Sequence, residues 1–165
     1  EQGIKLFADS GYAEELVDGE GDASLEAYLS AHLGKITDGD YFALLAYIEM
    51  CDEYADELQA IRDLVLEWKG VATCLGFGPR FLHSTGQAYK GGPNTGVFLQ
   101  ITCDDGSDLS VPAKQYTFGV IKAAQARGDF EVLTERGRRA LRLHLGPNVK
   151  AGLQTLQQIL VAALS

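Results

Sequence analysis

One segment limits the folds open to this chain more than any other: residues 41–48, YFALLAYI, are apolar without interruption. A strand that faced water on one side would alternate apolar and polar residues, and this run does not. Such a run predicts a strand that is buried on both faces, as in a parallel sheet covered by helices on either side. We expect this strand to lie at the centre of the fold.

Helical and strand patterns alternate along the rest of the chain. In residues 52–68 apolar side chains recur at helical spacing, and acidic side chains lie mostly on the other face. A second apolar run at 71–75 follows, so that strand, helix and strand are joined by short links as in a βαβ unit. Further elements are predicted as strands at 4–8, 97–102 and 140–145 and as helices at 25–33, 118–126 and 149–164.

Capping residues mark where some of these helices begin and end. Ser24 and Thr117 suit the N-cap position, whereas Gly34 and Gly128 suit positions at which a helix stops. Asp129 then suits the cap of another short helix. These signals predict a break in the helical structure at Gly128.

This alternation of strands and helices predicts the α/β class. We expect a three-layer α/β/α sandwich with a mainly parallel sheet, in one domain spanning residues 1–165. Residues 37–165 form the expected α/β core, and residues 1–36 form an N-terminal extension with a flexible, glycine-containing connection at 19–22. The strand at 140–145 alternates leucines with Arg142 and His144, so we expect it to be exposed on one face or near an edge.

Charge and cysteine content exclude several classes of partner. The formal net charge of −9 repels polyanions, which argues against nucleic acid or an anionic membrane surface as a partner. No apolar stretch is long enough to span a bilayer. Three widely spaced cysteines without a C-x-x-C motif predict reduced thiols and a cytoplasmic location. Because the chain opens on Glu1 rather than on a methionine, we also expect it to be a fragment.

Several conspicuous side chains have an ordinary structural interpretation. Trp68 and the aromatic residues of the 41–48 run fit core packing. His32 lies on an apolar helix face, and His144 points outward from its strand without an evident partner. One basic cluster could meet a phosphate, although a solvated face is the commoner situation; it comprises Arg136, Arg138, Arg139 and Arg142.

The glycine-rich segment at 76–96, GFGPRFLHSTGQAYKGGPNTG, is the strongest candidate for a functional site. It follows a predicted strand, and loops at the carboxyl ends of strands form the ligand crevice of an open α/β sheet. Hydrogen-bonding side chains within it include His83, Ser84, Gln87 and Lys90. The alternative is a structural turn, and a single histidine is more often structural than catalytic.

Two runs in this segment, Leu82-His83-Ser84-Thr85-Gly86-Gln87 and Lys90-Gly91-Gly92-Pro93-Asn94-Thr95-Gly96-Val97-Phe98, support a family resemblance. Together they resemble the closing region of the bifunctional transaldolase/glucose-6-phosphate isomerases. The similarity continues through residues 40–43, 117–119 and 128–130, and so extends over residues 38–150. The core pattern L-H-S-x-G-Q is also similar to a motif of shorter bacterial glucose-6-phosphate isomerases, in which the histidine is catalytic.

The resemblance implies a sugar-isomerase (SIS-like) fold and the interconversion of glucose 6-phosphate and fructose 6-phosphate, with a place in glycolysis, gluconeogenesis and the pentose phosphate pathway. It implies that His83 is the acid/base that opens the sugar ring, after which a glutamate moves a proton between C2 and C1 through a cis-enediol. It further implies that Ser84, Gln87 and Lys90 orient the substrate or the histidine. Proton transfer alone suffices for this chemistry, so no metal or organic cofactor is expected.

The chain departs from the family pattern in two places. Related fusions usually carry Leu-His-Lys where this chain has Ala88-Tyr89-Lys90, so a role for a second histidine does not transfer. The motifs resembling E-S-x-G-K and F-D-Q-P, which hold the base glutamate and a Gln/Lys pair, are absent. The resemblance therefore implies upstream isomerase and transaldolase domains as partners, a possible homodimer, and no turnover by this chain alone. The alternative hypothesis is a non-catalytic module for sugar-phosphate binding or dimerisation.

Overall fold

The apolar run at 41–48 forms an interior strand of the sheet, β2 (Tyr41–Tyr47), in a computed structural model that describes residues 3–17 and 23–164. Every residue of β2 after Tyr41 is buried. β2 pairs in parallel with β4 (Gly96–Thr102) on one side and with β3 (Ala72–Phe77) on the other. The strand is therefore buried on both faces, as its composition predicts.

The sheet has five strands in the order β1-β5-β4-β2-β3. β5 (Arg139–His144) continues the parallel pairing next to β4, but β1 (Lys5–Phe7) pairs with β5 in the antiparallel direction. The α/β class is confirmed, and the sheet is mixed, not mainly parallel as expected. An apolar run predicts a strand without predicting the direction of its pairing, and β1 comes from the N-terminal extension, outside the βαβ units. β1 also occupies the edge, so β5 lies one strand further in.

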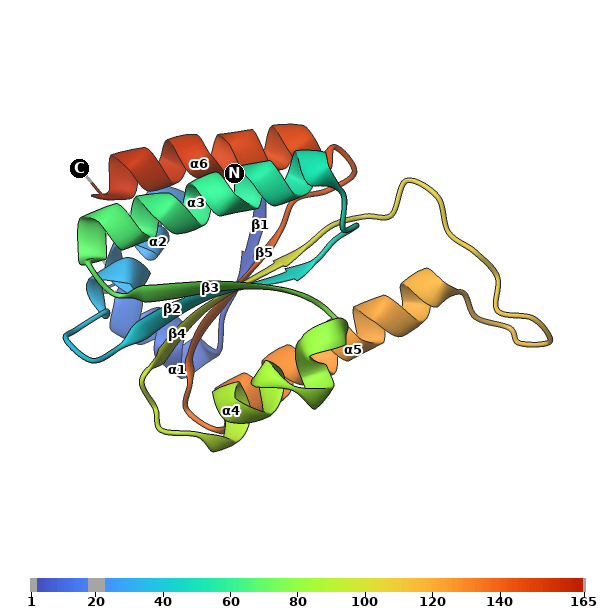
Figure 1. Ribbon diagram of the computed structural model, residues 1–165, viewed down its shortest axis with the longest axis horizontal. Helices are drawn as coiled ribbons and strands as arrows, with labels where there is room; N and C mark the ends of the chain where they lie inside the picture. The colour runs from blue at the N-terminus through green and yellow to red at the C-terminus, as the bar shows by residue number, and fades with distance from the viewer. Residues whose placement is uncertain (1–2, 18–22, 165) are drawn as a thin grey trace.

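Helices cover both faces of this sheet, an arrangement compatible with three layers (Figure 1). One face carries α2 (Leu25–Gly34), α3 (Asp52–Lys69) and α6 (Val149–Leu164), and the other carries α4 (Thr85–Gly91) and α5 (Phe118–Glu135). Each face has its own cluster of buried apolar side chains. Residues on either side of the sheet are thus removed from water, which is the main stabilising contribution in such a fold.

The N-terminal extension packs against the larger of the two clusters. Its helix α1 (Ser10–Leu16) contacts α2. α2 begins where the sequence indicates, because the Ser24 hydroxyl accepts a hydrogen bond from the Ala27 amide at 3.2 Å. The connection expected at 19–22 lies outside the described residues.

α5 runs through Gly128 as a single helix, so the break predicted there is wrong. Buried side chains at Ala126, Phe130 and Leu133 recur at helical spacing on both sides of the glycine. A glycine in a helix interior costs only about 1 kcal/mol relative to alanine. Burial of this apolar face outweighs that cost, and Asp129 becomes a buried residue of the same face.

Trp68 is also placed differently from expectation. Its side chain is 54% exposed, although Phe42 and Tyr47 are buried as predicted. The buried stripe of α3 follows Leu58, Ile61 and Val65, and Trp68 falls in the last turn of the helix. Continuing a helical period to the end of an element therefore overestimates the buried surface.

The basic cluster does not form one face: Arg136 is exposed, whereas Arg138, Arg139 and Arg142 are partly buried and take up separate positions. Arg139 forms a two-pronged ion pair with Asp40, with nitrogen–oxygen distances of 2.7 and 2.9 Å, and this guanidinium holds the pKa of Asp40 well below its usual range. Arg138 donates to the carbonyl oxygens of Lys90 and Gly92, each at 2.7 Å. Arg142 lies elsewhere, beside a cavity described below.

Candidate functional site

The glycine-rich segment is more ordered than a loop, because it folds into two short helices. β3 ends at Phe77, a 3₁₀ helix η1 (Arg80–His83) follows, and α4 begins at Thr85. Gly78 allows this path: a Cβ there would lie 2.5 Å from the ring of Tyr47. The segment therefore leaves the carboxyl end of β3 in close contact with β2, at the edge of the sheet where ligands bind in this class of fold.

His83 ends η1 with an exposed side chain, and its imidazole makes no hydrogen bond or ion pair with any described residue. The two polar residues after it act on the backbone instead. Ser84 donates from Oγ to the carbonyl of Phe81 at 3.3 Å, and Gln87 donates from Nε2 to the carbonyl of Leu82. We call these residues, Phe81 to Gln87, the His83 corner.

A buried aromatic side chain anchors the His83 corner. Phe81 is 5% exposed, and its ring packs edge-on against Tyr47 with a centroid distance of 5.5 Å. A second buried ring, Tyr89 on α4, lies 6.2 Å from Phe81. The backbone at the His83 corner is thus held by packing and hydrogen bonds, while the imidazole remains available to an external molecule.

Lys90 is committed to a buried ion pair. Its ammonium lies 2.6 Å from Oδ1 of Asp129, and the hydroxyl of Tyr47 donates to Oδ2 of the same carboxylate at 3.1 Å. Burial and the neighbouring Asp129 carboxylate raise the pKa of Tyr47. Asp129 is therefore a buried partner of Lys90 and not, as its place after Gly128 in the sequence indicates, the cap of a separate helix. The helical spacing of Asp129 with Ala126 and Leu133 was the signal that could have placed it on the buried face.

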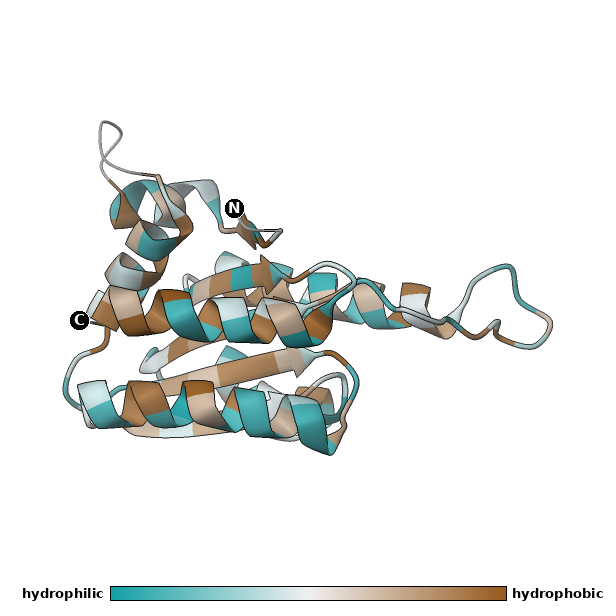
Figure 2. Cartoon of the chain, turned by 90° about the horizontal axis from the view of Figure 1, so that it is seen from above, coloured by the Kyte–Doolittle hydropathy of each residue, from teal (hydrophilic) through white to brown (hydrophobic). Residues whose placement is uncertain are grey.

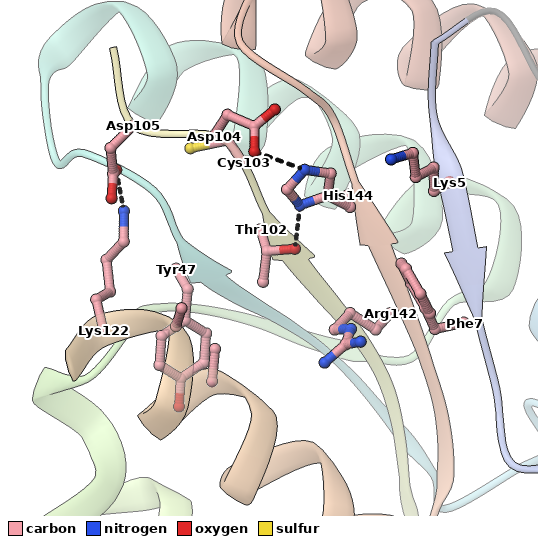
Figure 3. A pocket seen from close by; sticks show the side chains of 12 residues that line it. Lys5, Phe7, Tyr47, Thr102, Cys103, Asp104, Asp105, Lys122, Arg142 and His144 are labelled. Carbon is pink, nitrogen blue, oxygen red and sulfur yellow. Dashed lines mark hydrogen bonds and ion pairs between the residues drawn. The ribbon is translucent and has the colours of Figure 1, made fainter. Parts of the chain in front are cut away.

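A cavity of about 320 Å³ lies at the carboxyl ends of β4 and β5, on the face of the sheet that carries α5 (Figure 3). None of the four predicted site residues lines it. Its walls come from β1, β2, β4, β5, α5 and the segment after β4, and they consist of Lys5, Phe7, Tyr47, Thr102, Cys103, Asp104, Asp105, Lys122, Ala123, Ala126, Arg142 and His144.

His144 has two partners in this cavity, contrary to expectation. Its Nδ1 lies 3.1 Å from Oγ1 of Thr102, and its Nε2 lies 3.2 Å from Oδ1 of Asp104 (Figure 3). The pairing of Thr102 opposite His144 on neighbouring strands brings the first contact about. Alternation along one strand shows which face a residue occupies but not which residue lies opposite, so the sequence carried no signal for this contact.

Three further findings concern disulfides, metal binding and membrane-spanning helices. Cys51, Cys74 and Cys103 form no disulfide. Within residues 3–17 and 23–164, no three His, Cys, Asp or Glu side chains are grouped to hold a metal ion. In the same residues, no helix combines the length and apolarity needed to span a membrane.

Comparison with known proteins adds a fold neighbour and no family. No family model and no curated protein matches the chain. A solved structure from Thermus thermophilus, described as that of the hypothetical protein TT0462, is similar with a TM-score of 0.69 and 18% sequence identity. The similarity covers 86% of this chain but only 39% of that protein. Such a likeness defines the fold class, α/β with helices around a mixed sheet, and says nothing about activity.

Proposed function

We propose that this chain is the C-terminal segment of a cytoplasmic glucose-6-phosphate isomerase that is fused to transaldolase and interconverts glucose 6-phosphate and fructose 6-phosphate. One observation carries the proposal: the histidine of the L-H-S-T-G-Q run, His83, is exposed, has no partner among the described residues, and follows a strand of the sheet at its carboxyl end. A structural histidine would be hydrogen-bonded, as His32 is. The sheet with helices on both faces is compatible with a sugar-isomerase (SIS-like) domain.

In this proposal His83 opens the ring of the bound hexose phosphate. The C1–O5 bond breaks, the O1 hydroxyl gives up its proton, and O5 takes one, so a side chain that accepts and returns a proton lowers both barriers. The open-chain sugar then isomerises when a carboxylate carries the C2 proton to C1 and the O2 hydroxyl proton passes to O1. We assign that carboxylate to the upstream part of the parent protein, and we therefore expect no turnover from this chain alone.

The remaining candidates divide into two roles. Ser84 and Gln87 bond to the backbone of η1, so we propose that they are positioning residues that hold the turn from which His83 projects. Lys90 lies against Asp129, which supports a role in fastening α4 to α5. Ser84 and Gln87 are both exposed, so we propose that these two side chains also contact the substrate.

A second function, dimerisation, is favoured by a different observation. The middle of the segment between β4 and α5 projects far from the sheet in both views (Figures 1 and 2), and the segment leads into the start of α5. Apolar side chains in this region are open to solvent: Leu109 is 73% exposed and Phe118 is 53% exposed. Exposed apolar groups of this kind mark contact surfaces. The two functions are compatible if a neighbouring subunit receives His83.

The test is an isomerase assay on the full parent protein with His83→Ala. We expect the turnover of cyclic substrate to fall by at least about 100-fold, the range of general acid–base catalysis, without a change in circular dichroism. Glu67→Ala is a matched control, because Glu67 is an exposed titratable residue on α3, in the opposite helical layer. Unchanged turnover in His83→Ala would refute the catalytic role. Loss of folding or of assembly in that variant would favour the dimerisation module.

A further inference from the structure

Strand register gathers a group of polar and charged side chains on the α5 face of the sheet. Lys5 lies opposite His144, and Phe7 lies opposite Arg142, in the antiparallel pair β1 and β5. Thr102 of β4 lies opposite His144 on its other side. Since residues opposite one another point to the same face, all five side chains border the cavity of Figure 3.

The acidic residues of this cavity already have partners. Asp105 forms an ion pair with Lys122 of α5, and Asp104 pairs with His144 at 3.2 Å. Figure 3 shows both pairs on the side of the cavity formed by the segment after β4. The lining has three permanently charged cations, Lys5, Lys122 and Arg142, and these pairings involve both carboxylates but only Lys122 among the cations. Two cations, Arg142 and Lys5, are left over.

Arg142 is held in place by aromatic rings and not by an acid. Its guanidinium lies 4.4 Å from the ring centroid of Phe7 and 5.2 Å from that of Phe130. It has no hydrogen bond or ion pair with a described residue, and the acid that acts on its charge from α5, Glu131, is paired with Arg127 at 2.6 Å. Burial lowers the pKa of Arg142, although an arginine stays charged. A half-buried cation of this kind is costly unless an anion joins it.

Lys5 supplies a second unpaired charge in the lining of the same cavity. Its side chain makes no hydrogen bond or ion pair with the described residues, and it lines the same cavity from β1. The chain as a whole carries a net charge of −9, so two uncompensated cations beside one cavity run against the general charge balance. A single carboxylate would compensate one of them, whereas a doubly charged group compensates both.

We propose that this cavity binds a small phosphate monoester, with Arg142 donating two parallel hydrogen bonds to the phosphate and Lys5 adding positive charge to the lining of the same cavity. A phosphate monoester carries a charge of about −1.5 to −2 at neutral pH, which matches the two free cations. Arginine presents paired donors that fit phosphate oxygens. The cavity volume of about 320 Å³ suits a ligand of metabolite size.

This site is separate from the His83 corner, because no residue from Phe81 to Gln87 lines the cavity. The proposal therefore stands whether or not the chain belongs to an isomerase. It assigns the protein a second binding site, to which His83 contributes no side chain.

The test is calorimetric titration of the 165-residue chain with glycerol 3-phosphate, with glycerol as the uncharged control. We expect saturable binding of the ester and none of glycerol. Arg142→Ala should weaken binding by at least about tenfold, as loss of charged hydrogen bonds does. Lys5→Ala should weaken it by a smaller factor. Arg136→Ala removes the same charge from an exposed position before β5, at the other end of the strand, and should leave affinity within about twofold.

Several results would overturn the proposal. One is the absence of saturable binding by the parent chain, and another is unchanged affinity in a folded Arg142→Ala variant. Equal weakening by Arg136→Ala and Arg142→Ala would mean that only the general field attracts the ester. If Arg142→Ala fails to fold because its aromatic contacts are lost, Lys5→Ala decides, since Lys5 is an exposed residue of an edge strand.

Discussion

Acidification should destabilise this protein through His32, a buried residue that has no role in either proposed site. The side chain is fully buried; its Nε2 lies 3.1 Å from the carbonyl oxygen of Phe98, and its Nδ1 lies 2.8 Å from the hydroxyl of Tyr12. Because the carbonyl can only accept, Nε2 carries the hydrogen, and Nδ1 accepts from Tyr12. This neutral ring satisfies both partners, and burial lowers the pKa of His32 to about 3.

The sign and size of the effect follow from this pKa. In the unfolded chain a histidine titrates near pH 6.5, so between about pH 6.5 and 3 the unfolded state binds a proton that the folded state does not. The stabilisation is fully present above the unfolded pKa and declines as the pH falls below it. Between about pH 7.5 and pH 5 the loss from this one residue amounts to about 2 kcal/mol in the free energy of unfolding.

Urea unfolding at these two pH values measures the loss. In His32→Gln the side chain does not titrate, so the decrease between about pH 7.5 and pH 5 should be smaller than in the unmodified chain by about 2 kcal/mol. His83→Gln is the matched control, because it removes an exposed histidine and should retain the full decrease. If His32→Gln showed the same pH dependence as the unmodified chain, the assignment of the effect to His32 would be refuted.

Two further predictions concern α5. Asp129→Ala leaves the Lys90 ammonium without its partner in a mostly buried position, and should lower the free energy of unfolding by about 3 kcal/mol in thermal or urea unfolding. The double variant Lys90→Met with Asp129→Leu should recover most of this loss. An effect of Asp129→Ala below about 1 kcal/mol would contradict a buried pair. Gly128→Ala meets no atom within 4 Å of the new Cβ and lies inside a helix, so it should raise the free energy of unfolding by about 0.5–1 kcal/mol; a decrease would mean that the helix is interrupted there, as the sequence signals indicate.

The parts of the fold that depend on local pattern could be predicted from the sequence. The uninterrupted apolar run at 41–48 indicated a buried strand, and Ser24 indicated the start of α2, because both signals act within a few residues. The same local signals failed at Gly128, where the preference of one residue is outweighed by burial of the helix face on either side. The predicted burial of Trp68 was wrong because a periodic pattern does not show where the sheet beneath the helix ends.

The contacts that define both candidate sites were beyond prediction for a different reason. Lys90 meets Asp129 across 39 residues, and His144 meets Thr102 across 42 residues. Such pairs depend on strand register and on how helices lie on the sheet, and one sequence without relatives carries no information about either. The position of His83 after a strand was predictable; the freedom of its ring, and the pairing that leaves Arg142 without an acid, were not.

The antiparallel strand β1 has a consequence for the behaviour of the chain in solution. Its three residues pair with Arg142, Leu143 and His144, so the hydrogen-bonding groups on the outer side of the carboxyl-terminal half of β5 are not presented to other molecules. Proteolytic removal of the segment that ends with β1 would uncover that side, and would also take away Phe7, on which the Arg142 guanidinium rests. A nicked molecule would then offer this side of β5 as a template for the addition of a strand from another molecule. The three-residue strand β1 thus covers the carboxyl-terminal half of β5 at this edge, while β3 forms the other edge of the sheet.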